Sequence, residues 1–113
     1  MAQPPSLPEL KRYSLSKQLT AACYALTHDL PAEEGTHFSE YIRKAALELH
    51  FLIARSAFQK KKKQEKTLAN ARMALAVIDA AVDILVEVGL ATAAQVERVQ
   101  GLSARLAVLL DER

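Results

Sequence analysis

Seven basic side chains gather within residues 55–72, and they are the groups in this sequence best suited to chemistry. The stretch carries a single acidic residue, Glu65, although the formal net charge of the whole chain is only +2. Clustered ammonium and guanidinium groups attract a polyanion and release its counterions, so this cluster favours phosphate contacts with nucleic acid. The residues predicted to bind nucleic acid are Arg55, Lys60, Lys61, Lys62, Lys63, Lys66 and Arg72.

The kind of binding follows from what surrounds these residues. No aromatic residue interleaves with the lysines, so we expect binding driven by charge and shape, without base stacking or sequence reading. Lysine-rich ends also serve as solubility devices, and this alternative stays open.

Groups suited to catalysis are scarce. The sequence has no glycine-rich phosphate loop, no Cys-x-x-Cys and no Glu-x-x-His pair of the di-iron kind. His28, His37 and His50 are not spaced by four residues, so we interpret them as surface histidines or as hydrogen-bonded histidines at helix ends. The lone Cys23 is expected to be a small core residue. We therefore predict no catalytic residue, no metal, no cofactor and no enzymatic activity.

Three carboxylates, Asp79, Asp83 and Glu87, recur at steps of four and share one helix face. We interpret this row as a solvated face. Binding of a cation or a basic partner, or pairing with arginines from another helix or subunit, stays open as an alternative.

The element that organises the chain spans residues 67–88 and carries two apolar stripes at helical spacing. A helix on the surface of a monomer needs only one such stripe, so this helix is predicted to pack on two sides. The first stripe is Leu68, Ala71, Leu75, Ile78, Val82 and Leu85. The second stripe is Ala74, Val77, Ala81, Ile84 and Val88.

The periodicity predicts helices over about residues 7–28, 34–62, 65–88 and 92–111. Ser6 and Thr92 open capping boxes, and Gly89 is a left-handed helix end. The second helix also carries two stripes, and Phe51 and Phe58 belong to its second one. The four adjacent lysines at 60–63 are placed at the end of the second helix or in a hairpin loop, because like charges repel.

These elements predict an all-α fold, an up-down-up-down antiparallel four-helix bundle formed by one domain over residues 6–113 after a loose tail at 1–5. The apolar faces of the two middle helices exceed what one bundle can bury, so we expect a homo-oligomer. No apolar run of 18 residues is free of charge and the N-terminus has no signal pattern, so we expect a cytoplasmic protein that does not enter the membrane.

Several stretches resemble a known family. They are residues 26–34 (LTHDLPAEE), residues 41–49 (YIRKAALEL), residues 68–72 (LANAR) and the basic hairpin. Over roughly residues 10–110 the chain resembles the four-helix-bundle proteins that include the 23S rRNA intervening-sequence proteins. It is more similar still to the accessory variability determinants of diversity-generating retroelements.

The resemblance implies a pentameric barrel of bundles whose basic surface binds nucleic acid and a reverse transcriptase. It implies a non-enzymatic accessory protein that supports mutagenic synthesis of complementary DNA, with RNA or DNA held through phosphate contacts. The alternative function is a four-helix-bundle scaffold for protein interactions that does not bind nucleic acid.

Overall fold

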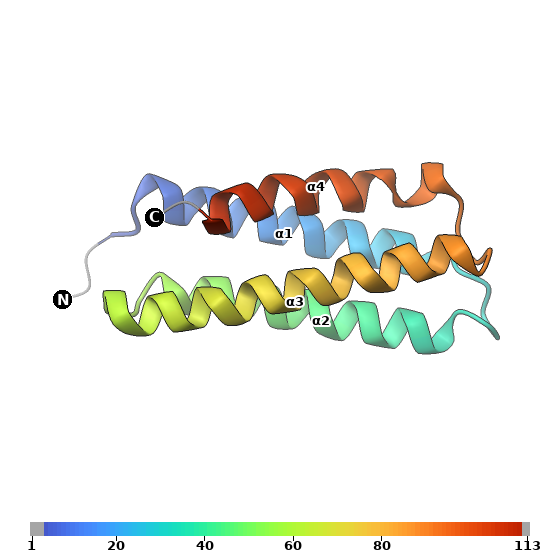
Figure 1. The fold of residues 1–113 in the computed structure, drawn as a ribbon, viewed down its shortest axis with the longest axis horizontal. Coiled ribbons are helices and arrows are strands. Elements are labelled where there is room, and N and C mark those ends of the chain that lie inside the picture. Colours follow the sequence, from blue (N-terminus) through green and yellow to red (C-terminus); the bar gives the residue numbers. More distant parts are fainter. Residues whose placement is uncertain (1–3, 112–113) are drawn as a thin grey trace.

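Four helices build the part of the chain that the computed structural model describes, residues 4–111, and no strand occurs among these residues. They are α1 (Leu7–His28), α2 (Thr36–Ser56), α3 (Lys61–Glu87) and α4 (Ala93–Asp111). The helices lie side by side in a bundle of 48 × 20 × 18 Å (Figure 1). The predicted all-α four-helix bundle is therefore confirmed for a single chain. The predicted tail at residues 1–5 falls largely on residues 1–3, which lie outside the described residues.

Each helix packs against its neighbours in the sequence, and α4 closes the bundle by packing against α1. Because short connections join consecutive helices, the helices alternate in direction, as an up-down-up-down bundle requires. As a result, the start of α1, the hairpin between α2 and α3, and the end of α4 all lie at one end of the molecule (Figure 1).

The core consists of one apolar stripe from each helix. On α3 the first predicted stripe is confirmed, since Ala71, Leu75, Ile78, Val82 and Leu85 are buried. Leu19, Ile42, Leu49 and Leu106 are among the fully buried residues that the other three helices contribute to the same core. Burial of such side chains contributes about 1.5–3 kcal/mol each, which is why this stripe and its partners hold the bundle together.

Local signals set most helix ends where they were predicted. The hydroxyl of Ser6 accepts a hydrogen bond from the backbone of Glu9 at 3.3 Å. Thr92 and Gln95 form a reciprocal capping box, with bonds of 2.8 and 3.2 Å. Gly89 has a φ of 78°, the left-handed conformation that ends α3. These capping signals are short-range, so they can be recognised without the tertiary structure.

The turn between α1 and α2 depends on Gly35. Its backbone N–H donates to the carbonyl of Pro31 at 2.7 Å. A Cβ atom at this position would lie 2.6 Å from that oxygen and 2.7 Å from Cβ of Leu30. Glycine is therefore required for the close approach that places Thr36 at the start of α2.

The predicted boundary between the two middle helices is wrong. The periodicity predicts a second helix that reaches residue 62, but α2 ends at Ser56 and α3 already begins at Lys61. The amides of Phe58 and Gln59 donate to Arg55 and Ser56 three residues back, which turns the chain instead of extending the helix. Charge repulsion does not keep the lysines out of a helix, because their side chains reach into water while the backbone stays helical.

No helix among residues 4–111 is both long and apolar enough to cross a lipid bilayer. A cytoplasmic location stays a prediction.

Candidate nucleic-acid interface

The tight hairpin between α2 and α3 is held by the polar side chains of Ser56 and Gln64. Ser56 is buried, and its hydroxyl donates to the carbonyl of Ile53 at 2.7 Å. The Gln64 amide of α3 donates to the Ser56 carbonyl at 2.9 Å, which also accepts from the Gln59 backbone, and so links α3 to the end of α2. These bonds fix the position of residues 57–60 between the helices, and with it the start of α3, where the lysines lie.

The four lysines at 60–63 lie at the N-terminus of α3. They do not extend the C-terminus of α2, one of the two predicted positions, and only Lys60 lies in the hairpin, the other predicted position. Lys60 is the N-cap residue, and Lys61 is the first helical residue. The N-terminus of a helix carries about half a positive charge, so each exposed lysine there costs roughly 0.3–1 kcal/mol. This local arrangement is unfavourable for an isolated chain and favourable when an anion is bound.

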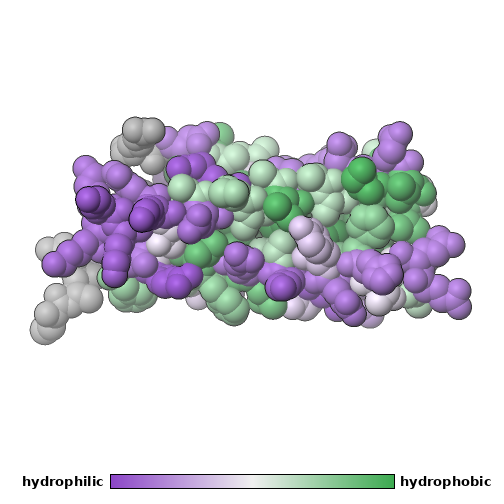
Figure 2. Space-filling model, turned by 60° about the horizontal axis from the view of Figure 1, so that its bottom comes forward, coloured by the Kyte–Doolittle hydropathy of each residue, from purple (hydrophilic) through white to green (hydrophobic). Residues whose placement is uncertain are grey.

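Most of the seven predicted residues come together at this end of the bundle. Arg55 is exposed in the last turn of α2, the lysines at 60–63 are exposed, and Lys66 is exposed one turn further along α3. Figure 2, in which α2 and α3 face the reader, shows hydrophilic side chains covering the hairpin end.

Arg72 is placed differently. It lies about 16 Å further along the helix axis than Lys61, at ~1.5 Å per residue. Its Nη1 donates to the carbonyl of Leu110 at 2.9 Å and ties the end of α4 to α3. Of the predicted residues, Arg72 therefore has an evident structural role as well.

Phe58 is a candidate that the sequence reasoning missed. It lies in the hairpin two residues before Lys60, and 73% of its surface is exposed. Its spacing assigned it to the second apolar stripe of a longer helix, but α2 ends before it. An exposed aromatic ring beside lysines is a platform on which a base can stack. Its nearness to the lysine run in the sequence was the signal that could have identified it.

A second surface feature, an apolar groove, runs between α2 and α3. It has a volume of about 410 Å³ and joins a more polar groove of about 420 Å³ towards the hairpin, with Tyr41 and Val77 in both. Figure 2 shows the apolar residues as a green band on this face. Its lining residues are His37, Phe38, Tyr41, Val77, Ala80, Ala81 and Ile84.

The groove contains much of the second predicted stripe of α3. Val77, Ile84 and Val88 are 37%, 48% and 56% exposed in the single chain. The larger side chains of this stripe are therefore exposed, whereas Ala74 and Ala81 are half-buried against the core. Such exposure is expected if the helix has a contact that its own bundle does not provide.

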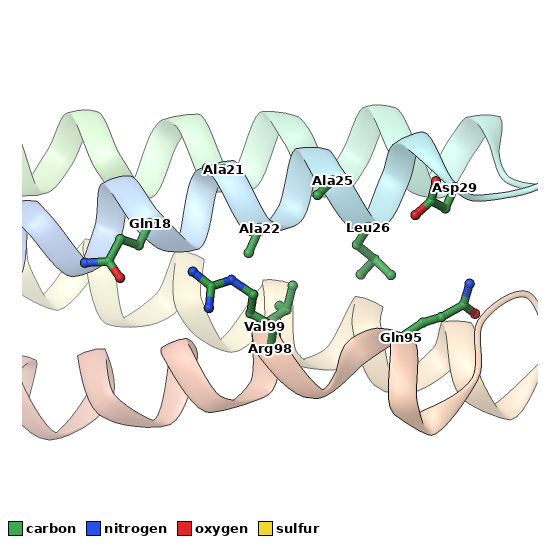
Figure 3. Close-up of a pocket in the computed structure, with 9 residues that line it drawn as sticks. All are labelled: Gln18, Ala21, Ala22, Ala25, Leu26, Asp29, Gln95, Arg98 and Val99. Carbon is green, nitrogen blue, oxygen red and sulfur yellow. The ribbon is translucent and has the colours of Figure 1, made fainter.

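The groove between α1 and α4 has a different lining. It measures about 370 Å³, and three alanines of α1 form its floor. In Figure 3, Arg98 extends from α4 towards α1, and Asp29 lies opposite Gln95 at one end. Its exposed apolar lining comes from small alanine side chains, and polar side chains stand at its ends.

His50 is hydrogen-bonded, but it is half-buried within α2 and does not lie at a helix end or on the open surface as predicted. Its Nδ1 lies 2.8 Å from the hydroxyl of Ser16, which itself bonds to the carbonyl of Tyr13 at 3.0 Å. Burial, with a smaller contribution from the positive charge of Lys17, lowers the pKa of His50 below its ordinary value of 6.5. Ser16 is completely buried, so it is inaccessible as a nucleophile.

The remaining candidates fit a structural interpretation. Asp79, Asp83 and Glu87 are exposed, as predicted, and Asp79 accepts a hydrogen bond from Ser103 of α4. Cys23 is buried, and desolvation raises its pKa to about 12. Within residues 4–111, no three metal-binding side chains lie close enough to share an ion.

Comparisons with known proteins add no relative to these observations. No protein-family model matches the chain, and no curated protein is significantly similar to it.

Proposed function

We propose that this protein is a non-enzymatic accessory protein that binds nucleic acid through the hairpin end of its bundle. The observation that carries the proposal is the concentration of lysines at the N-terminus of α3. There the helix dipole adds to their charge instead of offsetting it. Lys60, Lys61, Lys62, Lys63 and Lys66, together with Arg55, supply the phosphate contacts, and Arg72 extends the surface along α3.

Phe58 adds a second kind of contact to this surface. An exposed ring next to phosphate-binding lysines stacks on an unpaired base, which favours single-stranded nucleic acid over a closed duplex. Stacking tolerates any base, so the binding is expected to depend on salt and on strandedness more than on sequence.

The apolar α2–α3 groove supports assembly into a homo-oligomer. Its exposed valine, isoleucine and tyrosine side chains form a continuous strip, and surfaces of this kind mark contacts between proteins. A closed ring of five copies is the form that the family resemblance suggests. A ring repeats the basic hairpin around one axis, so that contacts of modest strength combine into tight binding.

The partner proposed for this assembly is the reverse transcriptase of a diversity-generating retroelement. In this role the protein holds the template or the product strand during mutagenic synthesis of complementary DNA. It contributes no catalytic group of its own. The support for this step is the sequence resemblance together with the basic end and the apolar groove.

The test is retention of a single-stranded oligonucleotide across a salt series. A triple variant, Lys62→Glu, Lys63→Glu and Lys66→Glu, is expected to lose binding while its circular dichroism is unchanged. Removal of one phosphate-binding lysine is expected to reduce the steepness of log K against log salt by about 0.7 for a single strand. The matched control, Lys17→Glu, Arg98→Glu and Arg105→Glu, changes charge equally on exposed residues of α1 and α4 and retains binding.

The alternative function is a protein-interaction scaffold, and the apolar groove is the observation that favours it. In that case the lysines only increase solubility, and the native protein binds no oligonucleotide at any ionic strength. Equal binding by the triple variant and the native protein at low salt contradicts the assignment of the hairpin.

A further inference from the structure

Arg12 is a buried charged residue that lacks a partner for part of its side chain. It lies in α1 and is 7% exposed. Among the described residues, its Nε has no hydrogen-bond acceptor. A buried guanidinium N–H without an acceptor lowers stability, and proteins normally satisfy such a group. The unmet donor therefore points to a partner from outside the described chain.

The space beside Arg12 is large enough for such a partner. A groove of about 630 Å³ lies where α1 passes the start of α3 and the end of α4. This is the end of the molecule that carries the basic hairpin (Figure 1). The groove is lined by Arg12, Lys61, Gln64, Glu65, Leu68, Arg72, Leu110 and Asp111.

The charges around this groove favour an anion. Arg12, Lys61 and Arg72 line it against two carboxylates, Glu65 and Asp111. Both carboxylates are exposed, so water solvates and screens them, whereas Arg12 is withdrawn from water. The buried charge therefore dominates the field inside the groove.

Two features of the backbone at this groove also favour an anion. The cap of α3 at Lys60 provides no side-chain hydrogen bond among the described residues, so the first amides of the helix stay available to an anion. At the other side of the groove, Arg72 donates a hydrogen bond to the carbonyl of Leu110 at the negative end of α4. This bond reduces the repulsion that the carbonyl would exert on an anion.

We propose that this groove binds a phosphate group, with Arg12 as the buried donor and Lys61 and Arg72 at its rim. Phosphate is the anion that best matches a guanidinium fork flanked by a second arginine and a lysine, because it offers several acceptor oxygens and up to two charges. The volume exceeds that of a lone ion and leaves room for an attached nucleoside. The inference rests on the proposed function for the source of that phosphate, a terminal phosphate of a nucleic-acid strand, whereas a free phosphate is the other source.

The direct test is a titration of the native protein with inorganic phosphate at constant ionic strength, with chloride as the reference salt. Nuclear magnetic resonance of the arginine Nε–H groups reports on Arg12 itself. The Arg12 signal is expected to shift and saturate, while the signal of Arg105, on the outer face of α4, stays unchanged. An Arg12 signal that moves no more in phosphate than in chloride overturns the proposal.

Two variants separate binding from folding. Arg12→Lys keeps a positive charge but removes the guanidinium fork, and it is expected to weaken phosphate binding about tenfold, the effect of losing one charge-assisted hydrogen bond. Lys61→Gln changes an exposed side chain, so it tests the same groove even if the arginine variant does not fold. Native affinity in every folded variant contradicts the assignment.

A comparison of oligonucleotides with and without a 5′ or 3′ phosphate then identifies the source. Tighter binding of a phosphorylated end, lost in Arg12→Lys, supports a nucleic-acid phosphate in the groove. If inorganic phosphate binds at Arg12 but no oligonucleotide binds, the groove is a site for free phosphate and the proposed nucleic-acid function fails. If oligonucleotides bind through the lysines without a shift at Arg12, the function stands and the groove proposal fails.

Discussion

The α2–α3 face and the α1–α4 face are built from the same kind of helix pair but present different surfaces. Their grooves have similar volumes, about 410 and 370 Å³. The first is lined by Tyr41, Val77 and Ile84, whereas the second is lined by alanines with Arg98 and Gln95 at its edge. Groove size alone therefore does not indicate a contact surface. The size of the exposed apolar side chains distinguishes the two grooves, because Val77 and Ile84 line the first and alanines line the second.

This asymmetry matters for assembly. A bundle with apolar surface all round would associate without a defined geometry, whereas a bundle with one apolar face associates through that face. The basic hairpin and the apolar groove lie on the same two helices but towards opposite ends, with the more polar groove between them (Figure 2). A symmetric assembly through the groove would still repeat the basic end once in every copy.

The largest expected effect separates the two stripes of α3. Ile78 is fully buried, so Ile78→Ala is expected to lower the free energy of unfolding by about 2–5 kcal/mol. Ile84→Ala removes the same atoms from a side chain that is 48% exposed, and in the monomer it is expected to cost less than about 1 kcal/mol. Urea denaturation at low protein concentration measures both, and equal losses would mean that the two stripes are buried alike.

The next effect concerns assembly through the α2–α3 face. Ile84→Glu places a charge in the apolar groove and is expected to raise the dissociation constant of the oligomer at least about hundredfold. Arg98→Glu on the α1–α4 face is the matched control and should leave the mass unchanged. Sedimentation equilibrium measures both, and a native protein that remains a monomer at high micromolar concentration would refute assembly.

A smaller effect tests how α4 is attached. Ser103 is buried and donates to Asp79 of α3, so Ser103→Ala is expected to cost about 1 kcal/mol. Ser14→Ala is the control, because the Ser14 hydroxyl is an exposed acceptor for Gln18 within α1. Thermal unfolding compares the two, and an equal small shift in Tm would show that the bond between α3 and α4 adds no stability.

The smallest effect is a dependence on pH. Burial lowers the pKa of His50 in the folded state, so the unfolded chain takes up this proton first as the pH falls through about 6.5. The stability that neutral His50 contributes is therefore present above pH 6.5 and is lost progressively below it. His50→Asn should therefore make stability depend less on pH in this range. The urea midpoint, measured between about pH 7.5 and 5.5, reports this dependence. If the urea midpoint of His50→Asn changes with pH as steeply as that of the native protein, then titratable groups other than His50 cause the pH dependence.

Much of the fold could be predicted because its signals are local. Ser6, Thr92 and Gly89 mark helix ends through bonds or dihedral angles within a few residues, and all three were placed correctly. The exception was the boundary between α2 and α3. It depends on the bond from Gln64 to Ser56, eight residues apart, and no periodic pattern contains that bond.

The candidate site was predicted in part. The lysines and Arg55 were recognised by their charge, which composition reveals directly. Phe58 was missed because its exposure depends on where α2 ends, and Arg12 was missed because a single arginine in an amphipathic helix carries no sign of burial. The groove around Arg12 is lined by residues of α1, α3 and α4, so no single stretch of sequence contains the pattern that would predict it.

By itself the sequence determined the class of fold and the surplus of apolar surface, since helical spacing and the number of apolar side chains are properties of the chain. Only the tertiary structure decided which stripe of α3 enters the core, which end of a helix receives the lysines, and where Arg12 is withdrawn from water. These outcomes depend on contacts between helices that are distant in sequence. Periodicity shows that a face is apolar, but only the packing of neighbouring helices decides whether that face is covered.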